Sequence, residues 1–186
     1  MFDWLRKGIA RKRANVGFVD DLYGSIADAA RHPALYTRYG VADTLMGRYE
    51  MMALHTFLFQ HRAKGASPAL EAMAQDVVDT HFRELDHSLR EVGIGDAAVP
   101  KRMKKLGRMV YGRWEAYGAA IDKRDAGELA EAFRRNVYAE GGDAACAPDL
   151  AAYAFAAAEA LHAQGDDDLL SGRIAFPQPG SVVESV

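Results

Sequence analysis

The sequence predicts a single-domain, all-α protein: an antiparallel helical bundle of about six helices with a short extended C-terminal tail. Three observations lead to this prediction. Strand signals are almost absent, helix start and stop signals recur along the chain, and neither an internal repeat nor a domain linker interrupts it. The chain has 186 residues, 49% of them hydrophobic and 26% charged, which suits one globular domain.

The N-terminal half contains two clear helix boundaries. A helix that follows the basic start of the chain stops before Pro33, because proline disfavours a helical conformation in the residue that precedes it. Asp43 or Thr44 then caps a long second helix, which runs to about Lys64 and is closed by Gly65. Apolar residues surround this second helix on nearly every side, so we expect it at the centre of the bundle.

The third helix opens at an N-cap and first-turn pair. Ser67 and Pro68 form this pair, and we expect the helix to continue to Val92 and to end at Gly93. A glycine-rich turn follows, in which Asp96 can cap the fourth helix.

The remaining helices have equally local signals. The fourth helix spans residues 100–121, and a capping box formed by Asp125 and Glu128 opens the fifth. An alanine-rich sixth helix starts near Pro148 and ends at Gly165.

The two ends of the chain differ from its middle. We divide the sequence into a basic amphipathic segment at 1–19, a helical domain at 20–177 and a disordered tail at 178–186. The helical period is lost after the sixth helix, and we expect a short extended segment around Ile174 to Phe176 before the disordered end.

The start of the chain combines apolar and basic residues. The apolar residues, which are the candidate membrane contacts, are Phe2, Trp4, Leu5 and Ile9. The basic residues among them are Arg6, Lys7, Arg11, Lys12 and Arg13. A short helix of this kind can lie in the interface of an anionic membrane, and it can equally dock on its own domain. A mitochondrial targeting sequence is a weaker third interpretation, because the segment is basic but poor in serine.

Several classes of protein are disfavoured by composition. The net charge of −3 does not indicate nucleic acid binding overall, and we expect no DNA partner. Cys146 is a single cysteine without a CxxC or histidine companion, which suits a reducing compartment. No run approaches the roughly 18 apolar residues of a membrane span, and no signal peptide with a cleavage site begins the chain. Nucleophile motifs, phosphate loops and dinucleotide fingerprints do not occur, so we expect neither an enzyme nor a cofactor.

Two ExxH pairs give the strongest enzyme hypothesis, a di-iron oxidoreductase, because di-iron bundles draw such pairs from two helices and further glutamates from two more. The candidate ligands are Glu84 with His87, Glu159 with His162, and the glutamates Glu50 and Glu115. Helical periodicity directs both pairs away from the apolar faces of their helices, whereas metal ligands in a bundle must point inward. We therefore expect two solvated pairs and no metal.

The second helix carries polar residues that need partners. Arg48, His55 and Arg62 share one stripe, but Glu50 lies on nearly the opposite side, so one helix cannot converge them on a substrate. A buried charge without a partner is costly, so neighbouring helices must supply partners. The candidates are Asp86, Arg90, Glu91 and Arg113, and we expect Asp86 to meet Arg48 or Arg113. Such a network more often fixes helix register than binds a ligand.

A basic run opens the fourth helix. It consists of Lys101, Arg102, Lys104, Lys105 and Arg108. Cations are electrostatically disfavoured at a helix N-terminus, so their placement there suggests a partner. A solvated charged face is the commoner explanation, and the alternative is binding to ribosomal RNA or anionic lipid.

Long motifs in these segments are similar to a known family. "RHPALYTRYGVADTLMGRYEMMALH" and "FRELDHSLREVGIGDAAVPKRMKKLGRMVYGRWEAY", supported by "RRNVY" and "LLSGRIAFPQP", resemble the ubiquinol-cytochrome c chaperone family. The resemblance covers residues 20–177. The family pattern has phenylalanine where Tyr49 stands, and aspartate-methionine-aspartate where this chain has Glu84, Leu85 and Asp86.

The resemblance implies a non-enzymatic helical chaperone that binds newly made cytochrome b and assists maturation of the cytochrome bc1 complex. Mitochondrial members act with a small partner protein near the ribosomal exit tunnel, so a ribosome or a small partner protein is a further expected contact. A bacterial protein would work in the cytoplasm, peripherally at the inner membrane, and a eukaryotic one on the matrix side in mitochondria. The alternatives are a di-iron oxidoreductase and a ribosome- or RNA-binding accessory protein.

Eight polar residues in the matching motifs are candidate contacts with the client or a partner. They are Arg48, His55, Arg90, Asp96, Lys101, Lys104, Arg113 and Tyr117. Each is equally well explained as a contact within the protein.

Overall fold

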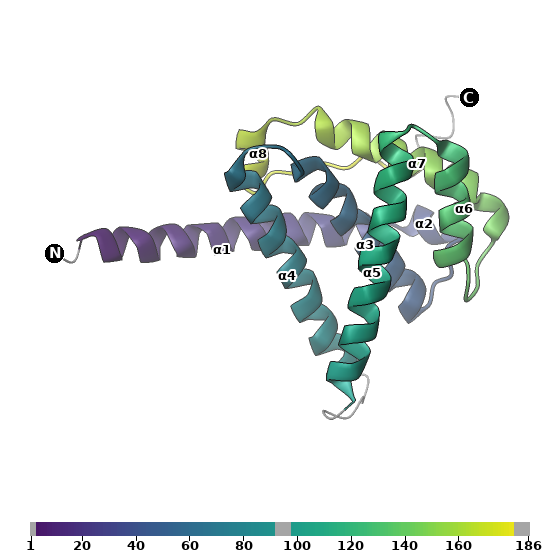
Figure 1. The fold of residues 1–186 in the computed structure, drawn as a ribbon, viewed down its shortest axis with the longest axis horizontal. Coiled ribbons are helices and arrows are strands. Elements are labelled where there is room, and N and C mark those ends of the chain that lie inside the picture. Colours follow the sequence, from purple (N-terminus) through teal and green to yellow (C-terminus); the bar gives the residue numbers. More distant parts are fainter. Residues whose placement is uncertain (1–2, 92–97, 181–186) are drawn as a thin grey trace.

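Helix α3, Leu45–Ala63, runs through the middle of the molecule, and the other long helices surround it (Figure 1). The computed structural model describes residues 3–91 and 98–180, with side chains from residue 16 onward. The other elements are α1 Asp3–Ala30, α2 Pro33–Thr37, α4 Pro68–Glu91, α5 Val99–Asp122, α6 Ala126–Asn136, η1 Ala144–Cys146, α7 Ala147–His162 and α8 Asp166–Leu170. The prediction of a single all-α domain is confirmed.

The six expected helices are the long ones, α1 and α3 to α7. The sequence analysis did not predict three short elements, namely α2, the 3-10 turn η1 and α8. The residues of α8 were expected to have no helical structure. Across the described ranges, extended pairing is limited to one isolated antiparallel bridge between Val41 and Gly142. No helix of the described chain is both long enough and apolar enough to cross a membrane.

Most predicted caps are present. The Thr44 side chain accepts a hydrogen bond from the Gly47 N–H at 3.1 Å, and the Asp125 side chain accepts one from the Glu128 N–H at 2.8 Å. The second half of the expected capping box is absent, because the Glu128 carboxylate pairs with Lys123 at 3.1 Å instead. The predicted end of α4 and the cap Asp96 lie outside the described residues.

A close backbone contact requires glycine at the start of α3. A Cβ on Gly47 would lie 1.9 Å from the Ala42 carbonyl oxygen, far inside contact distance. The backbone that leads from α2 into α3 therefore passes directly over the first turn of the central helix. This turn fixes the direction in which α3 enters the bundle.

Helix α1 crosses the boundary that the sequence suggested at residue 19 without a break. Its C-terminal part is buried through Leu22 and Ile26 and packs on α3 and α4. The N-terminal part extends well beyond the other helices (Figure 1). Where the helix leaves the bundle, Val16 and Phe18 are 55% and 36% exposed.

The core consists of two hydrophobic clusters that share α3. The larger one joins α3 to α5, α6 and α7 through Phe57, Trp114, Phe133 and Tyr153 among others. The smaller one joins α1, α3, α4 and α8; its large members include Leu22, Phe59, Leu70 and Leu169. Because α3 contributes to both clusters, it is buried on almost all sides, as its sequence predicted.

The C-terminal segment after α8 packs against both clusters through Ile174 and Phe176. The Gln164 side chain donates to and accepts from the backbone of Ala175, at 2.8 Å each. Further along, the Gly180 N–H donates to the Tyr39 hydroxyl at 3.0 Å. Gly180 thus contacts the helical domain from within the segment expected to be a disordered tail, and residues 181–186 of that segment lie outside the described chain.

Candidate functional site

A buried ion pair joins α3 to α5. The Arg113 guanidinium donates to the Glu50 carboxylate, and the two side chains are 12% and 5% exposed. Burial raises the pKa of Glu50, while Arg113 acts in the opposite direction. The prediction that a neighbouring helix supplies Arg113 as a partner for α3 is confirmed. The expected meeting of Asp86 with Arg48 or Arg113 is wrong, because Asp86 is only half-buried and pairs with Arg90 at 2.7 Å on its own helix.

His55 ties α3 to α7 inside the larger cluster. Its Nδ1 lies 2.8 Å from the Met51 carbonyl oxygen and must donate to it, so Nε2 accepts from the Tyr153 hydroxyl, also at 2.8 Å. Burial lowers the pKa of His55 to about 4, which keeps the ring neutral. The ring of Phe176 closes over it edge-on, with centroids 5.2 Å apart. His55 is therefore fully engaged inside the protein.

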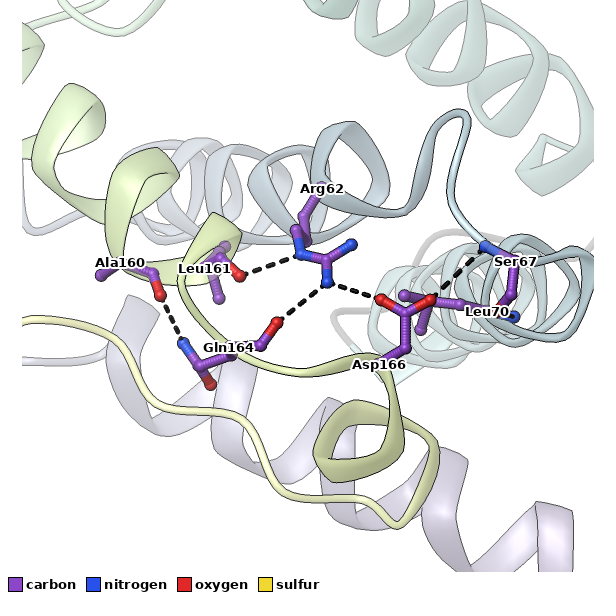
Figure 2. Close-up of polar contacts among 7 residues, drawn as sticks. All are labelled: Arg62, Ser67, Leu70, Ala160, Leu161, Gln164 and Asp166. Atoms are coloured by element: carbon purple, nitrogen blue, oxygen red, sulfur yellow. Dashed lines mark hydrogen bonds and ion pairs between the residues drawn. The ribbon is translucent and has the colours of Figure 1, made fainter.

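Arg62 binds the C-terminal end of α7 (Figure 2). Its guanidinium donates to the carbonyl oxygens of Leu161 and Gln164 at 3.0 and 2.9 Å, and to the Asp166 carboxylate at 2.6 Å. The other Asp166 oxygen accepts from the Ser67 N–H at 3.4 Å. One side chain thus connects α3, α7 and α8, and Asp166 extends the connection to the start of α4.

The candidate iron ligands do not converge. Glu84, His87 and Glu159 are at least half exposed on α4 and α7, and their ion partners are the nearby Arg83, Glu91 and Arg124 respectively. His162 lies edge-on to His61 with ring centroids 6.0 Å apart, and Glu50 is held by Arg113. In the described ranges, no three histidine, cysteine or acidic residues are grouped closely enough to hold a metal ion. The outward direction predicted for the ExxH pairs is confirmed.

The eight candidate contacts separate into buried and exposed groups. Tyr117 is 3% exposed and packs edge-on against Phe133, so it faces the core like His55 and the ion-paired Arg113. Arg48 is exposed; it pairs with Asp43 at 2.7 Å and lies over the ring of Tyr36. Arg90, Lys101 and Lys104 are also exposed, and Asp96 lies outside the described residues.

The end of α4 and the start of α5 lie at one end of the molecule (Figure 1), and the basic run belongs to this start of α5. All five basic residues of the run at the start of α5 are exposed. No side chain among the described residues caps the α5 N-terminus, where the N–H groups of the helix add to the positive character. This basic tip, residues 101–108, is suited to an anionic partner.

A cleft between α1, α3 and α4 is the best candidate for a binding site. Its volume is about 300 Å³, at the lower end of the range of small-molecule pockets. Met52 and Leu85 contribute to an apolar wall, and the exposed Leu45 and Arg48 belong to its rim. The structure thus places Arg48 at an opening and not in a buried network.

Two aromatic residues of the cleft lining, His81 and Tyr49, have polar atoms that are buried without a hydrogen-bond partner among the described residues. His81 is 2% exposed, and neither of its ring nitrogens has a hydrogen-bond partner within the described part of the chain. The hydroxyl of Tyr49, which is 7% exposed, lacks a partner there too, and the two rings stack with centroids 5.9 Å apart. Burial lowers the pKa of His81 to about 4 and raises the pKa of Tyr49, so both are neutral. The sequence analysis did not select either residue as part of a site. The signal that could have identified His81 is its position directly before Phe82, at the apolar face of α4.

The buried histidines predict a specific pH dependence of stability. The folded pKa values of His55 and His81 are about 4, below the unfolded value of about 6.5, so unfolding takes up protons between these values. The free energy of unfolding should therefore fall as the pH drops below about 6.5, by about 1.4 kcal/mol per pH unit for each fully titrating histidine. Denaturant titrations between about pH 7 and about pH 5 measure this slope.

His81→Phe is the matched variant, because it keeps a ring in the stack and removes the titrating group. For this variant, the free energy of unfolding should change less steeply with pH than for the unmodified protein, and the difference should equal the contribution of one histidine. An unchanged slope would show that His81 is not held neutral in the folded protein.

A protein-family model and a solved structure match most of this chain. The family described as ubiquinol-cytochrome C chaperone matches residues 37–176, slightly less than the range expected from the motifs. The crystal structure of the Cbp3 homolog from Brucella abortus is similar, with a TM-score of 0.87 and 45% identity, over 96% of this chain and 98% of that chain. The comparison with curated proteins gave no match. On the family match and this structural likeness, the chain belongs to the ubiquinol-cytochrome c chaperone family.

Proposed function

We propose that the protein is a non-enzymatic chaperone that binds newly made cytochrome b and assists assembly of the cytochrome bc1 complex. The observation that carries this proposal is the match of residues 37–176 to the chaperone family. The 45% identity to the Cbp3 homolog over almost the whole chain supports the membership in this family.

The apolar residues at the cleft between α1, α3 and α4 are consistent with binding of a membrane-protein client. A chaperone for a membrane protein needs apolar surface that can receive a client, and adaptable side chains such as methionine suit that purpose. Leu45 is 59% exposed at the rim of the cleft, and Met52 lines its wall. The exposed candidates Arg48, Arg90, Lys101 and Lys104 stay proposed contacts with a client or partner.

The basic tip supports a second, compatible contact. Its five exposed cations favour an anionic surface, either ribosomal RNA near the site of synthesis or a small acidic partner protein. Binding there would weaken as the salt concentration rises. A di-iron oxidoreductase has no comparable support, because both ExxH pairs are exposed on separate helices and Glu50 is buried and paired with Arg113.

We also propose that the protein works peripherally at the inner face of a bacterial cytoplasmic membrane. The likeness to a Brucella abortus protein favours a bacterial setting over the mitochondrial matrix. The start of α1 projects from the bundle. In the sequence, Phe2 precedes this helix, and Trp4, Leu5 and Ile9 stand in it among basic residues. An isolated helix of this length is marginally stable in water, so an interface that covers it would stabilise it.

Deletion of the gene tests the chaperone function. Assembled bc1 complex and the haem absorbance of cytochrome b should decrease, while other respiratory complexes stay nearly unchanged and a plasmid copy restores the loss. Native gels and difference spectra of membranes measure both quantities. Normal bc1 levels in the deletion strain would contradict the proposal.

Flotation with lipid vesicles tests the membrane contact. The protein should float with vesicles rich in phosphatidylglycerol and less with phosphatidylcholine vesicles, and salt should reduce the binding. Charge reversal at Arg11, Lys12 and Arg13 should abolish flotation, whereas reversal at Lys101 and Lys104 should not. If only the second variant loses binding, the basic tip and not α1 makes the contact.

A further inference from the structure

The floor of the cleft between α1, α3 and α4, formed by His81 and Tyr49, contains buried polar atoms without hydrogen-bond partners among the described residues. Buried polar side chains are nearly always hydrogen-bonded, because an unpaired group loses its bonds to water without replacement. Here two ring nitrogens of His81 and the hydroxyl of Tyr49 lack such bonds within the described residues. Both residues line the same cavity of about 300 Å³. Groups that are buried, unpaired and beside a cavity are suited to binding a ligand.

The charges around the cleft indicate which end of a ligand enters. Arg31 and Arg48 stand at the rim with Glu84, so the rim carries both signs, and Arg48 is already paired with Asp43. The floor is neutral, because neither His81 nor Tyr49 is ionised at physiological pH. An ion would lose its hydration there without gaining a countercharge. The inserted group is therefore uncharged.

The shape and lining indicate an aromatic group. The cavity cannot admit a whole helix, which is about 10 Å across, but it can admit one or two side chains. Its lining includes the rings of Tyr23, Tyr49 and His81 and the thioether of Met52, all of which pack well against an aromatic ring. A neutral imidazole offers one donor and one acceptor, and a tyrosine hydroxyl offers both. A ring that bears its own O–H or N–H could satisfy these groups.

We propose that the cleft is a receptor for one neutral aromatic side chain that carries a hydrogen-bonding group, a tyrosine or tryptophan of the client. This inference rests on the proposed chaperone function and deepens it by naming the part of the client that is bound. Leu45 and Leu85 contact the apolar residues that flank the inserted side chain. The ring inserts beside Met52, and its polar atom bonds to His81 or Tyr49 once these rings, which are buried in the unbound protein, turn toward the cleft.

Titration with small probes tests the chemistry of the cleft. The probes are N-acetyl-tyrosinamide and N-acetyl-phenylalaninamide, followed by nuclear magnetic resonance of the His81 imidazole. The tyrosine probe should bind about 2- to 10-fold more tightly than the phenylalanine probe, the usual effect of one net hydrogen bond. Both probes should shift the His81 signals, because both rings occupy the cleft.

Matched variants assign the preference to the floor of the cleft. Tyr49→Phe removes only a hydroxyl, and His81→Phe keeps a ring in place, so each should reduce the preference for the tyrosine probe. Tyr111→Phe removes a hydroxyl from a side chain that is 54% exposed outside the cleft, and it should leave the preference intact. Thermal melts identify any variant that does not fold, and the preference is then judged on the other one.

Each outcome supports or overturns the inference. Equal affinity of the two probes for the unmodified protein, or a preference that both floor variants retain, overturns it. If p-cresol binds the cleft but N-acetyl-tyrosinamide does not, the occupant is a free small molecule and not a client side chain, which also overturns it. These results leave the effect of gene deletion on bc1 assembly unchanged, so failure of the cleft inference is distinguishable from failure of the proposed function.

Discussion

Burial of α3 on almost every side is the constraint on which the rest of the structure depends. A helix in that position buries most of its polar side chains, and a buried charged or imidazole group is costly unless a neighbour supplies a partner. Glu50 is paired with Arg113 of α5, His55 with Tyr153 of α7, and Arg62 with the end of α7 and with Asp166 (Figure 2). Because each bond requires one relative position of two helices, these contacts fix the register of α5, α7 and α8 against α3.

The long helices could be predicted because their signals are local. Thr44 and Asp125 cap helices through contacts only three residues away, and the apolar period of each long helix repeats over several turns. The helix α8 could not be predicted in this way. Its five residues are too few to show a period, and Asp166 at its start is held by Arg62, far away in the sequence. The contact of Gly180 could not be predicted for the same reason, since its partner Tyr39 is far away in the sequence.

The candidate site was harder to predict than the fold. Sequence reasoning included Arg113 among four candidate partners for the central helix, because buried charges there need partners, and Arg113 pairs with Glu50. It assigned Asp86 to that network, although Arg90, one turn further along α4, was close enough to pair with it. The cleft was not predicted at all, since His81 and Tyr49 meet only after α1, α3 and α4 have packed. Its distinguishing property, polar atoms buried without partners, exists only in three dimensions.

A chaperone for a membrane protein must combine a rigid framework with surface regions that remain available to bind a client. The bonds of α3 supply the framework, while the cleft, the projecting start of α1 and the basic tip face outward from it. The most direct measurement is a crosslinking pull-down of a tagged copy from growing cells, with the recovered membrane proteins identified by mass spectrometry. Cytochrome b should be the main membrane protein recovered. Its absence from the pull-down, in cells that contain bc1 complex, would contradict the account.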